Sequence, residues 1–309
     1  MLVVRGHLHA PGWAGAAVAI GNFDGVHVGH RALIARAKAL AAAAGAGTQT
    51  VALTFDPHPS AVLAPAAPRE QIASLARRLE LLGEAGADAV VIEPFTRELA
   101  SLAPAAFVDE IVLGALRARA IVVGYDFKYG QGGAGTPDAL REHGARAGIA
   151  VDVVAPVQAG GEVASSTRVR AHLRAGELAA AERLLGRRWD VDGIVVHGAH
   201  RGRAIGIPTA NIQPDSALTI APGIYAVTLQ LAGEAPRPAV ASLGTNPTFV
   251  AGDALVLEVH VLDFAGDLYD RRVRVAFAAR LRDEAKFDSV EALVAQIERD
   301  IAAARVALA

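Results

Sequence analysis

The sequence contains no cysteine, which excludes disulfide bonds, thiolate metal sites and zinc fingers. Long apolar runs are also absent, and the alanine-rich stretch 39–46 is too short and too weakly apolar to cross a membrane. Arg5, His7 and His9 interrupt the only apolar start, so we expect no signal peptide. These absences predict a cytoplasmic protein without a membrane partner.

An excess of charge of one sign is missing too. The 30 basic and 32 acidic residues give a formal net charge of −2, which argues against a protein that wraps nucleic acid. At 52% hydrophobic and 20% charged residues, the 309-residue chain predicts a globular protein of about two domains. We expect small-molecule partners, no nucleic acid, and a monomer or weak homo-oligomer.

The first part of the chain alternates between short apolar runs and helical patterns. This alternation predicts an α/β domain, Rossmann-like, with a doubly wound parallel sheet and helices on both faces. The expected strands are 18–20, 50–55, 89–92, 120–123 and 149–155, and the expected helices are 31–44, 70–85, 104–117 and 137–147.

After residue 187 the pattern changes to apolar alternation with turn residues between the runs. It predicts an antiparallel β-barrel with strands 190–197, 223–231, 239–243, 255–262 and 273–277. A capping-box-like start at Asp288-Ser-Val-Glu291 predicts a closing amphipathic helix. We expect the two domains, residues 1–186 and 187–309, to meet near Leu185 to Arg188.

One segment, Gly21-Asn22-Phe23-Asp24-Gly25-Val26-His27-Val28-Gly29-His30, joins an expected strand to an expected helix. Its glycines let backbone amides approach an anion, and the helix adds unpaired N–H groups and the positive end of its dipole. His27 and His30 can then hydrogen-bond phosphoryl oxygens in a transition state. The alternative is a strand-to-helix turn whose histidines only cap the helix or bind a metal.

Three further segments of the first domain carry polar and aromatic side chains. Ser165, Ser166 and Thr167 precede an expected helix and are followed by Arg168 and Arg170, a chemistry suited to phosphate oxygens; a plain N-cap would explain one hydroxyl. The other two segments follow strands and offer rings for a flat heterocycle, or else form a rigid turn and a hydrophobic plug. They contain Phe55, His58 and Pro59, and Tyr125, Asp126 and Phe127.

The second domain begins with a basic glycine-bearing loop, which contains Gly198, Arg201, Gly202, Arg203 and Gly206. Pro208 then fixes an extended segment in which Thr209 and Asn211 face the same side and can offer oxygens to one hard cation. Thr and Asn are also common in turns. Glu258 interrupts an apolar run, where it is either a solvent-facing residue or a general base tuned by burial.

Together these motifs resemble those of the bacterial bifunctional riboflavin kinase/FAD synthetase family. His27 and His30 match its HxGH motif, the segment 165–170 matches SSTRxR, and Gly206 to Asn211 match GxPTAN. Tyr125 and Tyr129 stand where the family more often has Glu and Phe.

The resemblance implies a role for each matching residue. It implies catalytic roles for His27, His30, Arg168 and Glu258, and magnesium ligation by Thr209 and Asn211. Nucleotide binding is implied for Gly21, Asn22, Phe23, Asp24, Gly29, Asp126, Ser165, Ser166, Thr167, Arg170, Gly198, Arg201, Gly202, Arg203, Gly206 and Pro208. Flavin binding is implied for Phe55, His58, Pro59, Tyr125 and Phe127.

The activity implied by the resemblance has two steps. The barrel domain would phosphorylate riboflavin with Mg-ATP to FMN, and the first domain would adenylylate FMN with a second ATP to FAD and pyrophosphate. Two alternatives remain: an adenylyltransferase for another acceptor whose barrel only recognises it, and a flavin-binding regulator without turnover.

Overall fold

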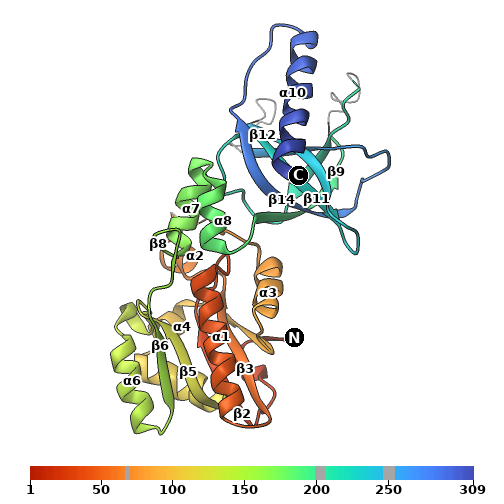
Figure 1. The fold of residues 1–309 in the computed structure, drawn as a ribbon. Coiled ribbons are helices and arrows are strands. Elements are labelled where there is room, and N and C mark those ends of the chain that lie inside the picture. Colours follow the sequence, from red (N-terminus) through yellow and green to blue (C-terminus); the bar gives the residue numbers. More distant parts are fainter. Residues whose placement is uncertain (67–69, 199–205, 246–254) are drawn as a thin grey trace. The chain divides into compact units, whose positions relative to one another are not determined.

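The computed structural model describes residues 1–66, 70–198, 206–245 and 255–309 (Figure 1). The chain forms two compact units: Met1–Arg69 with Leu75–Ser165, and Glu70–Ser74 with Ser166–Ala309. Among the described residues, no helix has the length and apolar character needed to cross a membrane. Each unit is described below by itself.

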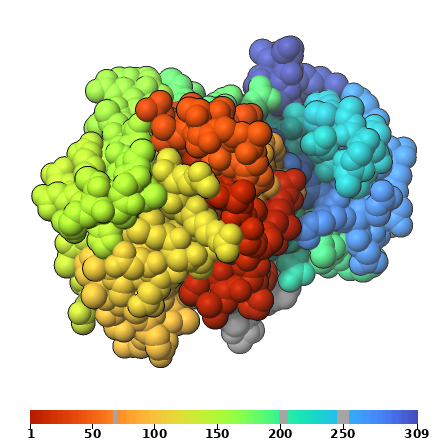
Figure 2. Space-filling view, turned by 90° about the horizontal axis from the view of Figure 1, so that it is seen from below, coloured from red at the N-terminus to blue at the C-terminus, as the bar shows by residue number. Residues whose placement is uncertain are grey.

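The first unit contains a six-stranded sheet in which every neighbouring pair is parallel. The order across the sheet is β1 (Leu2–Arg5), β4 (Ala89–Pro94), β3 (Thr48–Asp56), β2 (Gly15–Ile20), β5 (Ala118–Gly124) and β6 (Ala150–Val154). The first residues of the chain, Met1 to Val3, are exposed in the red part of Figure 2, and β1 is an edge strand. This confirms the predicted parallel sheet and adds β1, which the sequence analysis did not predict.

Alternate residues of the strands build two cores, one on each face of the sheet. Ala17, Ala19 and Val122 pack in the core that contains residues of α1 (Val28–Ala43) and α3 (Leu75–Glu84). Val18 and Ile121 pack in the opposite core, with η2 (Phe107–Ala115, a π-helix) and α6 (Pro137–Arg146). The expected helix 104–117 is therefore a short α5 (Pro104–Ala106) followed by a π-helix.

Shorter elements complete the first unit. They are η1 (His7–His9), α2 (Pro59–Leu63), α4 (Arg97–Ser101), η3 (Gln131–Gly133), β7 (Gln158–Ala159) and β8 (Glu162–Val163).

The second unit contains a closed antiparallel barrel, as predicted. Its strand order is β10 (Ala210–Pro214), β13 (Leu255–Val261), β12 (Arg237–Thr245), β11 (Gly223–Leu231), β14 (Arg272–Arg282) and β9 (Trp189–Val196). The terminal helix α10 (Val290–Leu308) packs against β11, β12 and β14, and Ser289 caps it by accepting from the Ala292 N–H at 3.1 Å. This confirms the predicted closing helix.

The second unit also contains two helices that precede the barrel and one short segment, here called the strap, from an earlier part of the chain. They are α7 (Ser166–Ala175) and α8 (Leu178–Leu185), and α8 contacts β9 and β14. The strap is the segment Glu70–Ser74, which precedes α3 in the sequence but belongs to the second unit.

The strap is held through its backbone carbonyl oxygens. Trp189 Nε1 donates to Ile72 O at 2.8 Å, Arg170 Nε donates to Glu70 O at 2.8 Å, and Thr219 Oγ1 donates to Gln71 O at 3.2 Å. The helix expected over 70–85 therefore begins only at Leu75, because strap carbonyls that serve as acceptors for the second unit are not used in a helix. The expected domain boundary at 186/187 stays a prediction.

Candidate functional site

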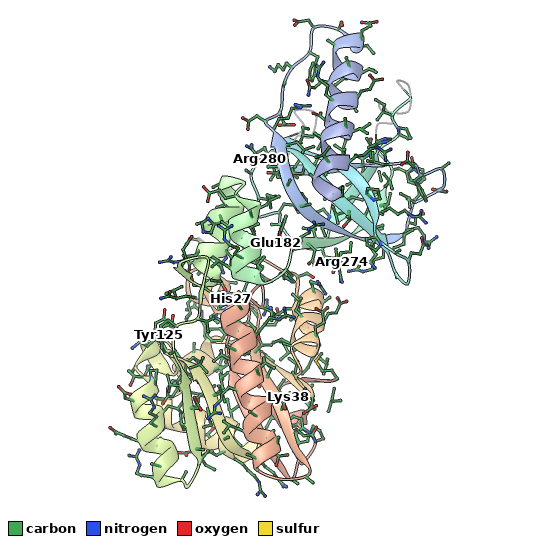
Figure 3. The ribbon with its side chains drawn as sticks, viewed as in Figure 1. His27, Lys38, Tyr125, Glu182, Arg274 and Arg280 are labelled. Atoms are coloured by element: carbon green, nitrogen blue, oxygen red, sulfur yellow. The ribbon has the colours of Figure 1, made fainter. Side chains whose placement is uncertain are left out.

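The first candidate site lies where the order of the parallel strands reverses. From the central strand β2 the chain proceeds to β3 and β4 on one side, and later to β5 and β6 on the other. Ligands of such sheets bind beyond the carboxyl ends of the strands at this point. The loops that follow β2 and β5 contain, respectively, His27 and Tyr125, both of which are labelled in Figure 3.

The loop after β2 is buried and has a strained backbone. Phe23 (φ 51°) and Val26 (φ 42°) adopt left-handed conformations on either side of Gly25 (φ 77°), and such conformations are costly for a β-branched residue such as valine. Phe23, Asp24 and Val26 are at most 1% exposed. Packing therefore holds this loop in one conformation.

His27 is the N-cap of α1. Its Nδ1 accepts hydrogen bonds from the backbone N–H groups of Gly29 at 3.1 Å and His30 at 3.3 Å. Since Nδ1 is an acceptor, the hydrogen of the neutral ring lies on Nε2, which is then the nitrogen that can donate to a phosphate. A Cβ atom at Gly29 would lie 3.0 Å from His27 Cε1, so glycine allows this cap. Capping, weighed above as an alternative to catalysis, is compatible with it.

His30 packs directly against His27. The two rings stack at 3.7 Å with an interplanar angle of 20°, and Phe23 meets the His30 ring edge-on at 5.2 Å. Burial, followed by the charges of His27 and Arg78, holds the pKa of His30 well below its usual 6.5. Its Nδ1 is buried and has no hydrogen-bond partner within the part of the chain that the structure describes. His30 is therefore neutral at pH 7 and retains a ring nitrogen without a bond.

Arg78 is a further residue beneath this loop, and the sequence analysis missed it. Its side chain is fully buried, and Nη1 donates to Phe55 O at 3.2 Å. Burial lowers the pKa of Arg78, while the nearby carboxylates of Asp24 and Asp56 raise it. The signal was present, because Arg78 stands three residues after Leu75 and four before Leu82, within the apolar stripe of its helix.

The loop after β3 contains a second histidine cap. His58 is 6% exposed, and its Nδ1 accepts from the Ser60 N–H at 3.2 Å, with Pro59 in the first turn of α2. Phe55 is 8% exposed and meets Phe95 edge-on at 5.8 Å. Phe55 and His58 are thus largely engaged with the protein.

The loop after β5 separates exposed from buried rings. Tyr125 is 47% exposed and Asp126 is exposed. Phe127 stacks at 5.4 Å on Tyr129, which is 8% exposed and whose pKa is raised by burial. Tyr129 is therefore a core residue, and Tyr125 is the ring available to a ligand.

The segment Ser165 to Arg170 spans the division between the units. Ala164 O would lie 3.7 Å from a Cβ at Gly29. The chain therefore passes close to the loop after β2, here called the histidine loop, just before Ser165, the last residue of the first unit.

The rest of this segment starts the second unit. Ser166 and Thr167 stand in the first turn of α7 and do not precede it as expected. Thr167 and Arg168 are exposed, whereas Arg170 is 5% exposed and binds the strap.

The second candidate site lies on the outer face of the barrel. The strand register places Asn211 of β10 and Ser242 of β12 on either side of Glu258 of β13. These three residues are partly exposed, whereas their neighbours along the strands point into the barrel and are buried: Ala210, Ile212, Ala241, Leu243, Leu257 and Val259. The register therefore brings Asn211 and Glu258 together as neighbours.

Two glycines of the expected phosphate loop have described positions. A side chain at Gly198 would overlap the amide of Asn211, so only glycine allows this approach. Gly206 is exposed with a φ of 77°. Arg201, Gly202 and Arg203 lie outside the described residues.

The donors at this site fit a hard divalent cation. The hydroxyl of Thr209 and the amide oxygen of Asn211 are oxygen ligands, and Asn211 is the register partner of Glu258. Within the described ranges, no group of three or more His, Cys, Asp or Glu residues could hold a metal. A cation here would depend on Thr209, Asn211 and the oxygens of a bound ligand.

Comparison with known proteins assigns each unit. The sequence model of the FAD synthetase family matches residues 10–168, and that of the riboflavin kinase family matches residues 185–308. A bifunctional riboflavin kinase/FMN adenylyltransferase from Pseudomonas fluorescens is 42% identical over 307 residues, which cover 99% of this chain and 97% of that protein. The chain belongs to this bifunctional family.

Other members agree over nearly the same length. The Listeria monocytogenes protein is 39% identical and the Escherichia coli K12 protein 38% identical, over 92% and 99% of this chain and 89% and 97% of their own. Among solved structures, a macrolide-efflux protein from Streptococcus pneumoniae is similar with a TM-score of 0.89 at 32% identity, over 99% of both chains. The family resemblance is therefore confirmed for the whole chain.

Proposed function

We propose that the two sites described above carry the two activities of the family, one in each unit. The chain phosphorylates riboflavin to FMN and adenylylates FMN to FAD, with ATP as donor in both reactions. The observation that supports the assignment of residues is that two of the family motifs bring their own residues together. His27 and His30 stack at the start of α1, and Asn211 and Glu258 stand side by side on the barrel.

In the kinase reaction, the ribityl hydroxyl of riboflavin attacks the γ-phosphorus of ATP. The bond from that phosphorus to the β-phosphate oxygen breaks, ADP leaves, and Glu258 takes the hydroxyl proton. Asn211 is the register partner of Glu258, so the base and the phosphate-binding group are held by adjacent strands. Gly198, Gly206 and Pro208 would contact the nucleotide, and we extend this role to Arg201, Gly202 and Arg203.

Thr209 and Asn211 would hold Mg²⁺ in this site. When bound, Mg²⁺ offsets negative charge on the phosphates. The amide of Asn211 is placed by its close approach to Gly198.

In the adenylyl transfer, a phosphate oxygen of FMN attacks the α-phosphorus of the second ATP, and pyrophosphate leaves. The FMN phosphate is already ionised, so the protein needs to align the reactants and stabilise charge, without a covalent intermediate. His27 would donate through Nε2, and the neutral His30 would stabilise the charged phosphates. Arg168, which is exposed, would bind phosphate, and Arg170, whose Nε also donates to Glu70 O of the strap, would contact the nucleotide.

The remaining residues are assigned on the same basis, their match to the family motifs. Nucleotide contacts are proposed for Gly21, Asn22, Phe23, Asp24, Gly29, Asp126, Ser165, Ser166 and Thr167, and flavin contacts for Phe55, His58, Pro59, Tyr125 and Phe127. Among these rings, the exposed Tyr125 is the most accessible. We also propose a cytoplasmic location and a monomer or weak homo-oligomer, and the charge balance argues against a nucleic-acid partner.

Product analysis tests this proposal. Purified protein is incubated with ATP and either riboflavin or FMN, with and without Mg²⁺, and the flavins are separated by chromatography. We expect FMN and then FAD from riboflavin, and FAD alone from FMN. N211A should stop FMN formation and still convert supplied FMN to FAD. Loss of both activities in folded N211A would contradict the assignment of one reaction to each unit.

A further inference from the structure

His260 lies two residues after Glu258 on β13. Side chains at alternate positions of a strand share a face, so His260 accompanies Glu258 on the outside of the barrel. Both are partly exposed, while Val259 between them is fully buried in the core. The His260 ring is therefore on the same face as the kinase site and outside the packed core.

The ring makes one specific contact with the site. His260 Nδ1 lies 2.7 Å from Pro208 O. A carbonyl oxygen only accepts, so Nδ1 must carry the hydrogen. Proline has no N–H of its own, which leaves this carbonyl as the one backbone group through which Pro208 can be held by a hydrogen bond.

This bond acts directly on the proposed metal ligands. Pro208 O belongs to the peptide group that joins Pro208 to Thr209. The pairing of β10 with β13 begins at the residue after Thr209, where Ala210 pairs with Val259. The side-chain bond from His260 thus lies just beyond the end of the ladder and holds the backbone carbonyl that precedes Thr209.

We infer that His260 is a positioning residue of the kinase reaction: its Nδ1–H bond to Pro208 O holds Thr209 and Asn211 in place for Mg-ATP. The inference rests on the proposed function of the barrel site. Loss of a group that orients metal ligands typically weakens metal binding about 10- to 100-fold. We expect an effect of that size on the Mg²⁺ dependence of FMN formation.

Three substitutions separate the hydrogen bond from the bulk of the ring. In H260N the amide nitrogen is bonded to Cγ, as Nδ1 is, and can still donate to Pro208 O. H260Q keeps a polar side chain but places its amide one carbon further out, and H260F keeps a ring without a donor. A matched control is H9F, because His9 Nδ1 makes the same kind of bond, to Arg5 O at 2.8 Å, in the first unit.

The measurement is the rate of FMN formation from riboflavin against Mg²⁺ concentration, with FAD formation from supplied FMN as an internal control in the same chain. We expect H260Q and H260F to need about 10- to 100-fold more Mg²⁺, and H260N and H9F to stay within about threefold of wild type. FAD formation from FMN should be unchanged in all four variants, which also shows that the first unit is folded.

The outcomes are distinguishable. Unchanged Mg²⁺ dependence in H260Q would overturn the inference, and so would an equal loss in H260N and H260Q, since that would mean that ring packing and not the bond matters. N211A is measured in parallel. If N211A also kept full kinase activity, the barrel site itself would be wrong, whereas an inactive N211A beside an unaffected H260Q would remove only the role of His260.

Discussion

The two units solve the same problem, holding the phosphates of ATP, with different structural means. In the first unit the candidate groups lie in loops at the carboxyl ends of parallel strands, where α1 begins and His27 accepts from two of its backbone N–H groups. In the barrel the candidate groups are side chains at fixed register positions on the outer face, such as Asn211 opposite Glu258.

The difference follows from the secondary structure. An open parallel sheet ends in helix N-termini, so a loop with a strained and buried backbone around Phe23 and Val26 can present amides and histidines to an anion. A closed antiparallel barrel uses its strand amides in the ladders. Phosphates and any cation must therefore be bound by hydroxyl, amide and carboxylate side chains. We expect the reaction of the first site to depend on its histidine side chains, and that of the second site to depend on the side chains that the strand register brings together.

The comparison predicts its largest effect at Glu258. E258Q removes the proposed base and should reduce FMN formation about 10²- to 10⁴-fold, while FAD formation from supplied FMN continues. Rates of both reactions are measured on the same preparation. E234Q is the control, because Glu234 makes the same charge change at an exposed barrel turn beside Arg237. Normal FMN formation by E258Q would show that another group takes the proton.

A second prediction reverses the pattern. H30A should lower FAD formation about 10²- to 10³-fold, the typical effect of removing one charge-stabilising group, and leave FMN formation unchanged. H143A, which removes a surface histidine paired with Asp109 at 2.6 Å, should affect neither rate. If H30A slowed FMN formation as strongly as FAD formation, the two sites would not be independent.

Gly198 tests whether the barrel site depends on close backbone approach. In G198A the new methyl group meets the amide of Asn211, so we expect FMN formation at limiting Mg²⁺ to fall about 10- to 100-fold, as for other displaced metal ligands. G12A is the matched control, since a Cβ there would come no closer than 3.9 Å to Arg117. Equal kinetics of G198A and wild type would place the Asn211 amide outside the reaction.

The strap sharpens the comparison, because it is joined to the first unit in sequence and packs with the second. W189F removes the hydrogen bond from Trp189 Nε1 to Ile72 O in a buried contact, and losing a buried hydrogen bond of this kind typically costs about 1–3 kcal/mol. We expect the free energy of unfolding of the second unit to fall by that amount in denaturant titrations followed by kinase activity. W13F, the same change in the first unit, should leave this transition in place, and an unshifted transition in W189F would contradict the role of the strap.

The smallest effect concerns pH and the stability of the first unit. The folded pKa of His30 lies well below its unfolded value of 6.5, mainly because of burial. Below pH 6.5 the unfolded chain therefore binds a proton that the folded chain does not. The free energy of unfolding then decreases as the pH is lowered, by at most about 1.4 kcal/mol per pH unit. Above pH 6.5 this contribution is constant.

H30Q isolates that contribution. The difference in unfolding free energy between wild type and H30Q, followed by thermal or denaturant unfolding, should stay constant from pH 8 to 7 and change as the pH falls from 6.5 towards 5. A difference that is constant over the whole range would show that His30 titrates normally in the folded protein.

Local patterns in the sequence predicted most of the architecture. Period-2 and helical spacing located most strands of both units, and the capping-box-like segment Asp288 to Glu291 predicted where the last helix starts; the structure shows that Ser289 is its cap. The Gly21 to His30 segment was correctly placed between a strand and a helix. These features depend on residues close together in the chain, where periodicity and capping act.

Long-range contacts account for what was missed. The helix expected from residue 70 begins at Leu75 because Trp189, Arg170 and Thr219 bind the strap carbonyls. No spacing rule places residue 72 beside residue 189. Likewise the short strands β1 and β10 depend on the strands with which they pair.

The sequence by itself therefore determined the order of two units, their classes of fold and the chemical types of the groups offered to phosphate. Only the tertiary structure decided how those groups are held: Arg78 buried beneath the histidine loop, His27 bound through Nδ1 to the helix, and His260 bound to Pro208 O. The physical reason is that a residue's type fixes which bonds it can make, whereas packing and strand register fix which partner lies within reach.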